Sequence, residues 1–98
     1  MNKCSCGILM RPENADTLVI ILKNANPCLS FQTISIYDWD TGSPVLVHLQ
    51  NYFIPGNGTN TIEFPLIYNG YDCSYIIDKY EVKTDPQIKG ITVKISTK

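Results

Sequence analysis

Hydrophobic and polar residues alternate most clearly in the middle of the chain, in two runs separated by a short polar segment. The runs are FQTISIYDW at residues 31–39 and VLVHLQNYF at residues 45–53, and the segment between them contains Gly42. Because successive side chains of a strand point to opposite faces, this pattern predicts a central β-hairpin. Ile34 and Ile36 then share the core-facing side of the first strand. The residues of the second strand that we expect in the core are Val45, Val47, Leu49 and Phe53.

Four further strands are predicted around this hairpin, separated by segments rich in proline, glycine and asparagine. They comprise residues 17–23, 61–68, 73–82 and 91–97. The first of them, TLVIILK, has apolar residues on both faces, which indicates a strand covered on both sides. Its core-facing residues are expected to be Leu18, Ile20 and Leu22.

The second half of the chain adds two turns and one edge strand. Pro65 cannot donate a hydrogen bond to a neighbouring strand, so the strand at residues 61–68 is expected at a sheet edge. Residues 54–60 (IPGNGTN) contain an Asn-Gly pair that can adopt positive φ, and residues 84–90 (TDPQIKG) also predict a turn. The last strand alternates most regularly of all, and its inward residues are expected to be Ile91, Val93 and Ile95.

Six strands without a helical pattern predict an all-β fold, a small antiparallel β-sandwich of jelly-roll or immunoglobulin-like type. The sandwich domain comprises residues 17–98, and residues 1–16 form an extended N-terminal connector arm. Six strands are few for such a sandwich. Residues 7–11 are therefore candidates for a further strand, added either to their own domain or to a neighbouring copy.

The charge of the chain argues against two classes of partner. Eight basic and nine acidic residues are dispersed without a run of either sign, which argues against nucleic acid and against an anionic membrane surface. No stretch approaches the ~20 apolar residues of a membrane span, and the first ten residues lack the apolar segment of a secretory signal peptide. We therefore expect no nucleic-acid partner, no membrane partner and no secretory signal peptide.

Four cysteines in a small β-rich chain favour an oxidising environment instead. The two indications agree if the protein is made in a reducing compartment and meets oxidant later. Components of spore coats and virions have this history when the cell that made them lyses.

Catalytic and metal-binding motifs are weak. His48 is the single histidine, and its alternation points it away from Val47 and Leu49 into solvent. Asp38 and Asp40 resemble part of a calcium loop but lack its remaining ligands, so a turn is the favoured interpretation, with Gly42 at positive φ. The four cysteines lack the C-x-x-C spacing of common zinc sites. We expect no enzyme activity, no metal site and no cofactor.

Aromatic residues offer a different function. A patch of them would suit a sugar or a protein partner, although half or more are expected in ordinary cross-strand pairs. The candidates are Tyr37, Trp39, Tyr52, Tyr68, Tyr71 and Tyr75. A small binding module, for carbohydrate or for protein adhesion, is therefore the alternative function.

The first residues of the arm carry two closely spaced cysteines. Cys4 and Cys6 point to the same side of an extended chain and cannot bond each other without strain. An arm of eight extended residues spans up to ~28 Å, enough to reach a neighbouring domain. Cys28 and Cys73, both expected beside turns, are the other two cysteines that the arm could reach.

The segment MNKCSCG, followed by one small β-sandwich with further cysteines, resembles the endospore appendage (Ena) pilins of spore-forming bacteria. The resemblance implies a jelly-roll subunit that forms fibres through disulfides between copies. It implies Cys4 and Cys6 as donors and Cys28 and Cys73 as acceptors, on the surface of a spore or elsewhere outside the cell. We therefore expect a structural subunit that self-assembles with copies of itself. If assembly is not covalent, the expected arm contacts are Ile8, Leu9 and Met10 in a groove of a neighbour.

Overall fold

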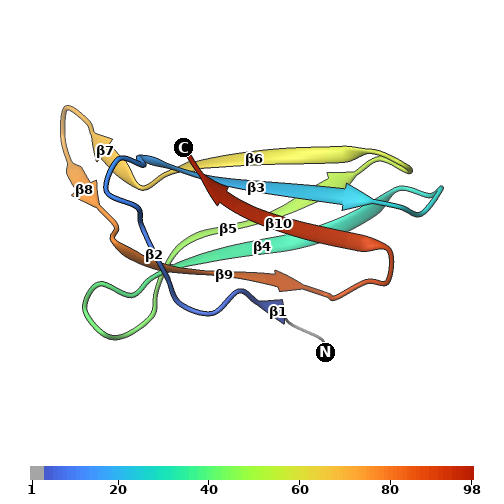
Figure 1. Ribbon diagram of the computed structural model, residues 1–98, viewed down its shortest axis with the longest axis horizontal. Helices are drawn as coiled ribbons and strands as arrows, with labels where there is room; N and C mark the ends of the chain where they lie inside the picture. The colour runs from blue at the N-terminus through green and yellow to red at the C-terminus, as the bar shows by residue number, and fades with distance from the viewer. Residues whose placement is uncertain (1–3) are drawn as a thin grey trace.

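The computed structural model describes residues 4–98, with side chains from Ser5 onward. The described chain is an antiparallel β-sandwich, as predicted, with two sheets and a projecting hairpin (Figure 1). The first sheet has the strand order β1-β9-β4-β5, with β2 also paired to β9. Its strands are β1 (Cys4–Ser5), β2 (Leu9–Met10), β4 (Ser30–Asp38), β5 (Val45–Ile54) and β9 (Lys79–Asp85).

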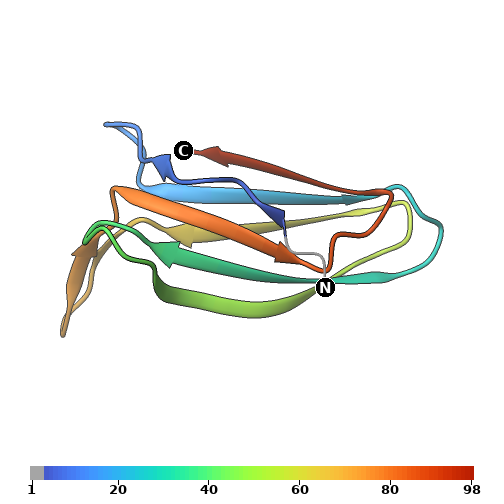
Figure 2. The same cartoon turned by 90° about the horizontal axis from the view of Figure 1, so that it is seen from below.

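The second sheet has the order β10-β3-β6. Its strands are β3 (Thr17–Asn24), β6 (Thr59–Pro65) and β10 (Ile91–Thr97). The hairpin consists of β7 (Ile67–Asn69) and β8 (Ser74–Ile76). The molecule measures 42 × 25 × 24 Å, and the hairpin and the β3–β4 loop lie at opposite ends of its long axis (Figures 1 and 2).

The centre of the core comes from β3 and β4. Ile34 and Ile36 are fully buried, as predicted, and face the buried leucines and isoleucine of β3. Those residues are Leu18, Ile20 and Leu22, and their prediction is also confirmed. The alternation of β3 continues on its other face, but Val19 and Ile21 are only half-buried there.

The prediction that β3 is covered on both faces is therefore wrong. Val19 lies between Glu63 and Ser96, and Ile21 between Thr61 and Lys94, on neighbouring strands. No third layer covers this face among residues 4–98. Val19 and Ile21 are therefore shielded only from the sides, by the side chains of these neighbours.

The prediction for β5 is also wrong, because the strand presents its other face to the core. The four residues expected inside are between 39% and 61% exposed: Val45, Val47, Leu49 and Phe53. The register instead pairs His48 with the buried Ile36 and Tyr52 with the buried Gln32. The inner face of β5 is thus formed by His48, Tyr52 and the fully buried Ile54, and His48 is half-buried rather than solvated.

A β-bulge and the position of β5 explain this exposure. The register shifts between Ile36 and Tyr37, so that Val47 is an extra residue on β5. Among the described strands, β5 is hydrogen-bonded to β4 alone, so it is an edge strand of the sheet. Its apolar outer face therefore borders solvent, with Leu49 opposite Ser35.

Several predicted strand boundaries shift. The strand expected at residues 61–68 divides, because the amides of Leu66 and Ile67 bond to the carbonyl of Asp16 and draw the chain out of the ladder. Its first part, β6, is an edge strand that ends at Pro65, which confirms the expected edge. The strand expected at residues 73–82 divides into β8 and β9.

The last turn and the last strand differ in part from their predictions. The turn expected at residues 84–90 begins only after Asp85, because Thr84 and Asp85 still belong to β9. Ile91 and Ile95 are half-buried in β10 as expected, but Val93 is exposed because β10 is an edge strand. The positive φ expected at Gly42 and in the Asn57-Gly58 turn is confirmed, at Gly42 and Asn57 respectively.

The N-terminal arm lies along the free edge of β9. Leu9 pairs with Tyr80, the backbone of Cys4 pairs with Thr84, and Gly7 separates β1 from β2 with a φ of 76°. Leu9 packs against the core and Ala15 is buried. Residues 7–11 thus add a strand to their own chain, and the arm covers the edge that β9 would otherwise expose. No helix long and apolar enough to cross a membrane occurs within the described part of the chain.

Candidate functional site

The four cysteines occupy different surroundings. Cys28 lies in the β3–β4 loop and Cys73 in the loop of the β7–β8 hairpin, and both thiols are exposed and free. Because these loops lie at opposite ends of the molecule, the two thiols of one chain are kept apart (Figure 1). Cys6 is half-buried: its sulfur accepts the amide of Val82 at 3.2 Å. Cys4 lies in β1, and its side chain is outside the described residues.

The three predicted arm contacts divide between the core and the surface. Leu9 packs against the core of its own chain, whereas Ile8 and Met10 are 53% and 69% exposed. An ion pair of 2.7 Å between Arg11 and Asp78 fixes the arm just beyond β2. The arm is therefore tied down in its own chain and leaves two large apolar side chains in solvent.

Glu81 fixes the other end of the arm. Its carboxylate accepts hydrogen bonds from the hydroxyl of Ser5 and, at 3.0 Å, from the indole Nε1 of Trp39. Burial raises the pKa of Glu81, but these two hydrogen bonds and the charge of Lys83 outweigh burial. The pKa therefore lies below the ordinary value, and the group is a carboxylate at neutral pH.

The two aspartates of the predicted hairpin have separate tasks. Asp40 accepts the backbone amides of Asp78 and Lys79, at 3.1 and 2.7 Å, and so joins the β4–β5 turn to the start of β9. Asp38 accepts the amide of Asp40 at 2.8 Å. These bonds are those of an Asp-rich turn. Within residues 5–98 no three potential ligands among His, Cys, Asp and Glu gather at one point.

A groove of about 380 Å³ opens between the two sheets beside the hairpin. It is lined by one carboxylate and four apolar or aromatic side chains from β4, β5, β6, β8 and the segment after β8: Asp38, Val47, Phe64, Tyr75 and Ile77. The sequence indicated Asp38 and Tyr75 as candidates, but placed Val47 in the core. It gave no signal for Phe64 or Ile77, because the groove is assembled from segments distant in the chain.

The aromatic walls of the groove are held in place by neighbouring side chains. The ring of Tyr75 stacks on Tyr68 with 5.5 Å between centroids, and its hydroxyl donates to the carbonyl of Pro65 at 3.2 Å. Burial, with smaller effects of Cys73 and Tyr68, raises the pKa of Tyr75, so this hydroxyl remains a donor at neutral pH.

Phe64 packs against the ring of His48 at 5.5 Å. The Nε2 atom of His48 is hydrogen-bonded to the hydroxyl of Tyr52 at 2.7 Å, which fixes the histidine in turn. The half-buried His48 therefore orients Phe64, one wall of the groove.

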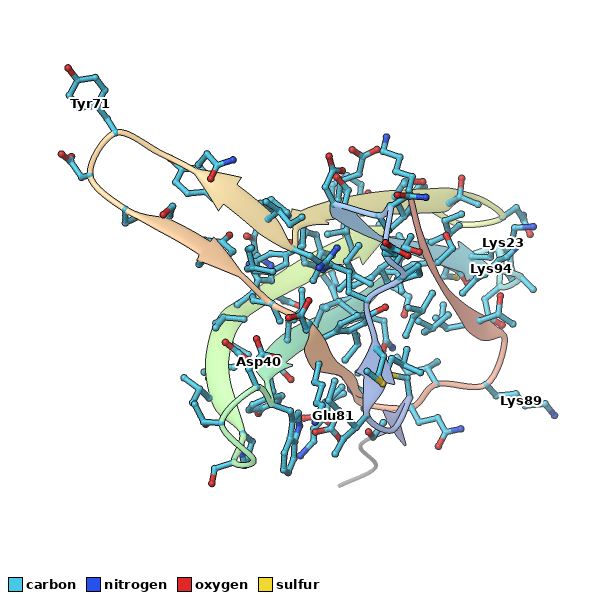
Figure 3. The ribbon with its side chains drawn as sticks, turned by 60° about the vertical axis from the view of Figure 1, so that its left-hand side comes forward. Lys23, Asp40, Tyr71, Glu81, Lys89 and Lys94 are labelled. Atoms are coloured by element: carbon cyan, nitrogen blue, oxygen red, sulfur yellow. The ribbon has the colours of Figure 1, made fainter. Side chains whose placement is uncertain are left out.

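The six aromatic residues considered above do not form one patch. Tyr68 and Tyr75 are a cross-strand pair, as expected, and Tyr71 stands fully exposed at the tip of the hairpin (Figure 3). Tyr37 instead lies under the ammonium group of Lys83, 5.0 Å from it, on the outer face of the first sheet. Of this set, Tyr75 lines the groove.

No protein-family model, curated protein or solved structure matches this chain.

Proposed function

We propose that the protein is a structural subunit that assembles with copies of itself into an extracellular fibre or surface layer. The observation that carries this proposal is the position of Cys28 and Cys73, two exposed thiols at opposite ends of an elongated sandwich. A subunit with a reactive group at each end can be linked to two neighbours, which is the requirement for a linear polymer. The proposed setting, the surface of a spore, is supported only by the resemblance of the amino-terminal segment.

The N-terminal arm supports the same proposal. It pairs with β9 through two strands of two residues each, and it leaves Ile8 and Met10 exposed. The same pairing with β9 of a neighbouring copy would preserve these hydrogen bonds, as in domain swapping. Such an exchange would carry Cys4 and Cys6 to the neighbour.

The edge strand β5 adds a further surface for association. Its sequence, VLVHLQNYFI, has no Asp, Glu, Lys or Arg, whereas the edge strands β6 and β10 carry Glu63 with Pro65 and Lys94, respectively. Charges and proline are the usual devices that prevent edge strands from pairing with other chains. An uncharged ten-residue edge is therefore suited to contact between copies.

Electrophoresis after exposure to air tests the covalent form of this assembly. Thiols of two copies lose two hydrogen atoms to dissolved oxygen, which gives one disulfide and hydrogen peroxide. We expect a ladder without reductant and a single band of 11.0 kDa with it. The combined substitutions Cys28→Ser and Cys73→Ser should shorten the ladder, because they remove the thiol at each end of the subunit. A monomer band without reductant in the unsubstituted protein would contradict the covalent assembly.

The groove beside the hairpin favours a second candidate function, a small binding module. Its volume of about 380 Å³ lies within the range of small-molecule sites, and its lining is mainly apolar. Negative-stain microscopy separates the two functions, since a subunit of a polymer gives filaments and a binding module gives discrete particles.

A further inference from the structure

The groove contains one charged group in otherwise apolar surroundings. Asp38 is half-buried, and no cation among the described side chains forms an ion pair with it. The hydrogen bond that it accepts from the amide of Asp40 leaves further acceptor capacity on the carboxylate. A carboxylate beside apolar walls is stabilised by a cation that enters the same space.

The walls that face this space are aromatic and preorganised. Phe64 is held by His48, and Tyr75 is held by Tyr68 and by the carbonyl of Pro65. The β-bulge makes Val47 the extra residue on β5, and Val47 then lines the groove. Because these contacts exist in the free protein, a ligand would not have to order the site.

The polar groups of the groove are too few for a sugar. Apart from Asp38, the lining offers one hydroxyl, that of Tyr75, and this hydroxyl already donates to Pro65. Sugars present many hydroxyl groups, which need several hydrogen-bonding partners when they lose water. An anion would be repelled by Asp38, and a purely apolar ligand would leave its charge without a partner.

We propose that the groove binds an alkylammonium group, the charged end of a lysine side chain or of a free organic amine. The ammonium group lies at Asp38, where it forms a charge-assisted hydrogen bond, and faces the rings of Phe64 and Tyr75. The alkyl stem packs on Val47 and Ile77. This binding site goes beyond the proposed self-assembly, because it requires neither the thiols nor the arm.

Titration with n-butylammonium chloride, followed by NMR shifts of backbone amides, tests the site in the full-length protein with reductant present. We expect saturable shifts at Asp38, Phe64 and Tyr75, and binding about tenfold weaker for 1-butanol, which has a similar shape and no charge. Equal binding of the alcohol, or shifts that lie elsewhere, would overturn the proposal. The reductant keeps this result separate from the covalent assembly.

Two matched substitutions test whether the carboxylate of Asp38 is the charge that binds the ammonium group. Asp38→Asn retains an acceptor for the amide of Asp40 and should weaken binding of butylammonium about tenfold. Asp72→Asn removes the same charge from the exposed hairpin loop, outside the lining, and should change the affinity less than twofold, since exposed charges are screened by solvent and salt. Equal effects of the two substitutions would contradict a site at Asp38.

A lysine with acetylated amino and methylamidated carboxyl groups distinguishes the two sources of the amine. Binding like that of butylammonium assigns the groove to the side chain of a protein partner. Binding of butylammonium alone assigns it to a small amine. Either result supports the ammonium site, and absence of binding by both compounds would exclude it.

Discussion

Glu81 joins three segments that are distant in the sequence. From β9 it accepts hydrogen bonds from Ser5 in the arm and from Trp39 at the end of the β4–β5 hairpin. Lys83, two residues away on the same face of β9, adds a favourable charge. The ionised form of Glu81 therefore holds the arm in position, and protonation of this one carboxylate would weaken the contact.

Protonation of Glu81 should loosen this junction. Since its pKa is lowered in the folded state, the group stabilises the fold above the pKa of the unfolded chain, and this contribution is lost as the pH falls through the folded pKa. The loss begins near the ordinary glutamate value, at about pH 4. Glu81→Gln should lower the free energy of unfolding at pH 7 by about 1 kcal/mol and reduce its decline between pH 5 and pH 3, measured by urea unfolding.

Glu63→Gln is the control for this measurement. Glu63 forms an ion pair of 2.8 Å with Lys98, but both side chains are exposed, so its removal should change stability by less than about 0.5 kcal/mol. If both substitutions reduced the decline in the free energy of unfolding between pH 5 and pH 3 equally, the hydrogen bonds to Glu81 would not be the cause of that decline.

The alternation of hydrophobic and polar residues predicted the buried face correctly for some strands and not for others. In β3 and β4, which have a neighbour on each side, the most apolar face is the inner one, as at Leu18 and Ile36. In β5 the more apolar face points to solvent, because the bulge and the edge position allow the inner face to be formed by His48 and Tyr52. Alternation therefore predicts that a strand exists, but not which face an edge strand buries.

The groove was harder to predict from the sequence than the buried face of a strand. Its lining comes from four separate segments, and Val47 lines it only because of a bulge that depends on pairing with β4. A local pattern contains no information about such a register shift. The same holds for the arm, whose docking depends on the edge of β9, about 70 to 80 residues later in the chain.

The exposed edge of β5 leads to a prediction about association that does not involve thiols. Leu49→Lys places a charge on the outer face of β5, where Leu49 is 61% exposed, so the fold should tolerate it. With reductant present, this variant should sediment as monomer at concentrations where the unsubstituted protein associates, because a charged edge strand resists pairing.

Thr61→Lys provides the matched control on β6. Thr61 is also an exposed residue on the outer face of an edge strand, in a strand that already carries Glu63 and Pro65. Association should persist in this variant. If both variants sedimented like the unsubstituted protein, β5 would have no part in contacts between copies.

Some exposed charges lie apart along the described part of the molecule. Lys23, Lys89 and Lys94 lie toward one end, and Asp40 lies toward the other (Figure 3). The three lysines are exposed and form no ion pair with any residue of the described chain. Copies stacked head to tail would bring unlike charges together, whereas head-to-head stacking would not. Contact of these lysines with Asp40 of the next copy would give the same linear order as the positions of Cys28 and Cys73.

We expect the arm to determine whether copies assemble in this order. Deletion of residues 1–10 removes the strands that cover β9 and the contact of Leu9 with the core, but leaves every fully buried residue in place. The shortened chain should therefore fold, with a β-type circular dichroism spectrum and a free energy of unfolding lower by about 2 kcal/mol. It should form no filaments by negative-stain microscopy.

Cys4→Ser combined with Cys6→Ser separates the thiols of the arm from its strands. This variant keeps β1 and β2, so its stability should stay within about 1 kcal/mol of the unsubstituted protein, because serine at position 6 retains an acceptor for the amide of Val82. If the covalent link runs from the arm to Cys28 or Cys73 of the next copy, its filaments should form but dissociate in denaturant, since strand exchange persists without that link. Filaments of normal resistance in this variant would assign the covalent link to Cys28 and Cys73 alone. Filaments from the shortened chain would exclude the arm from assembly.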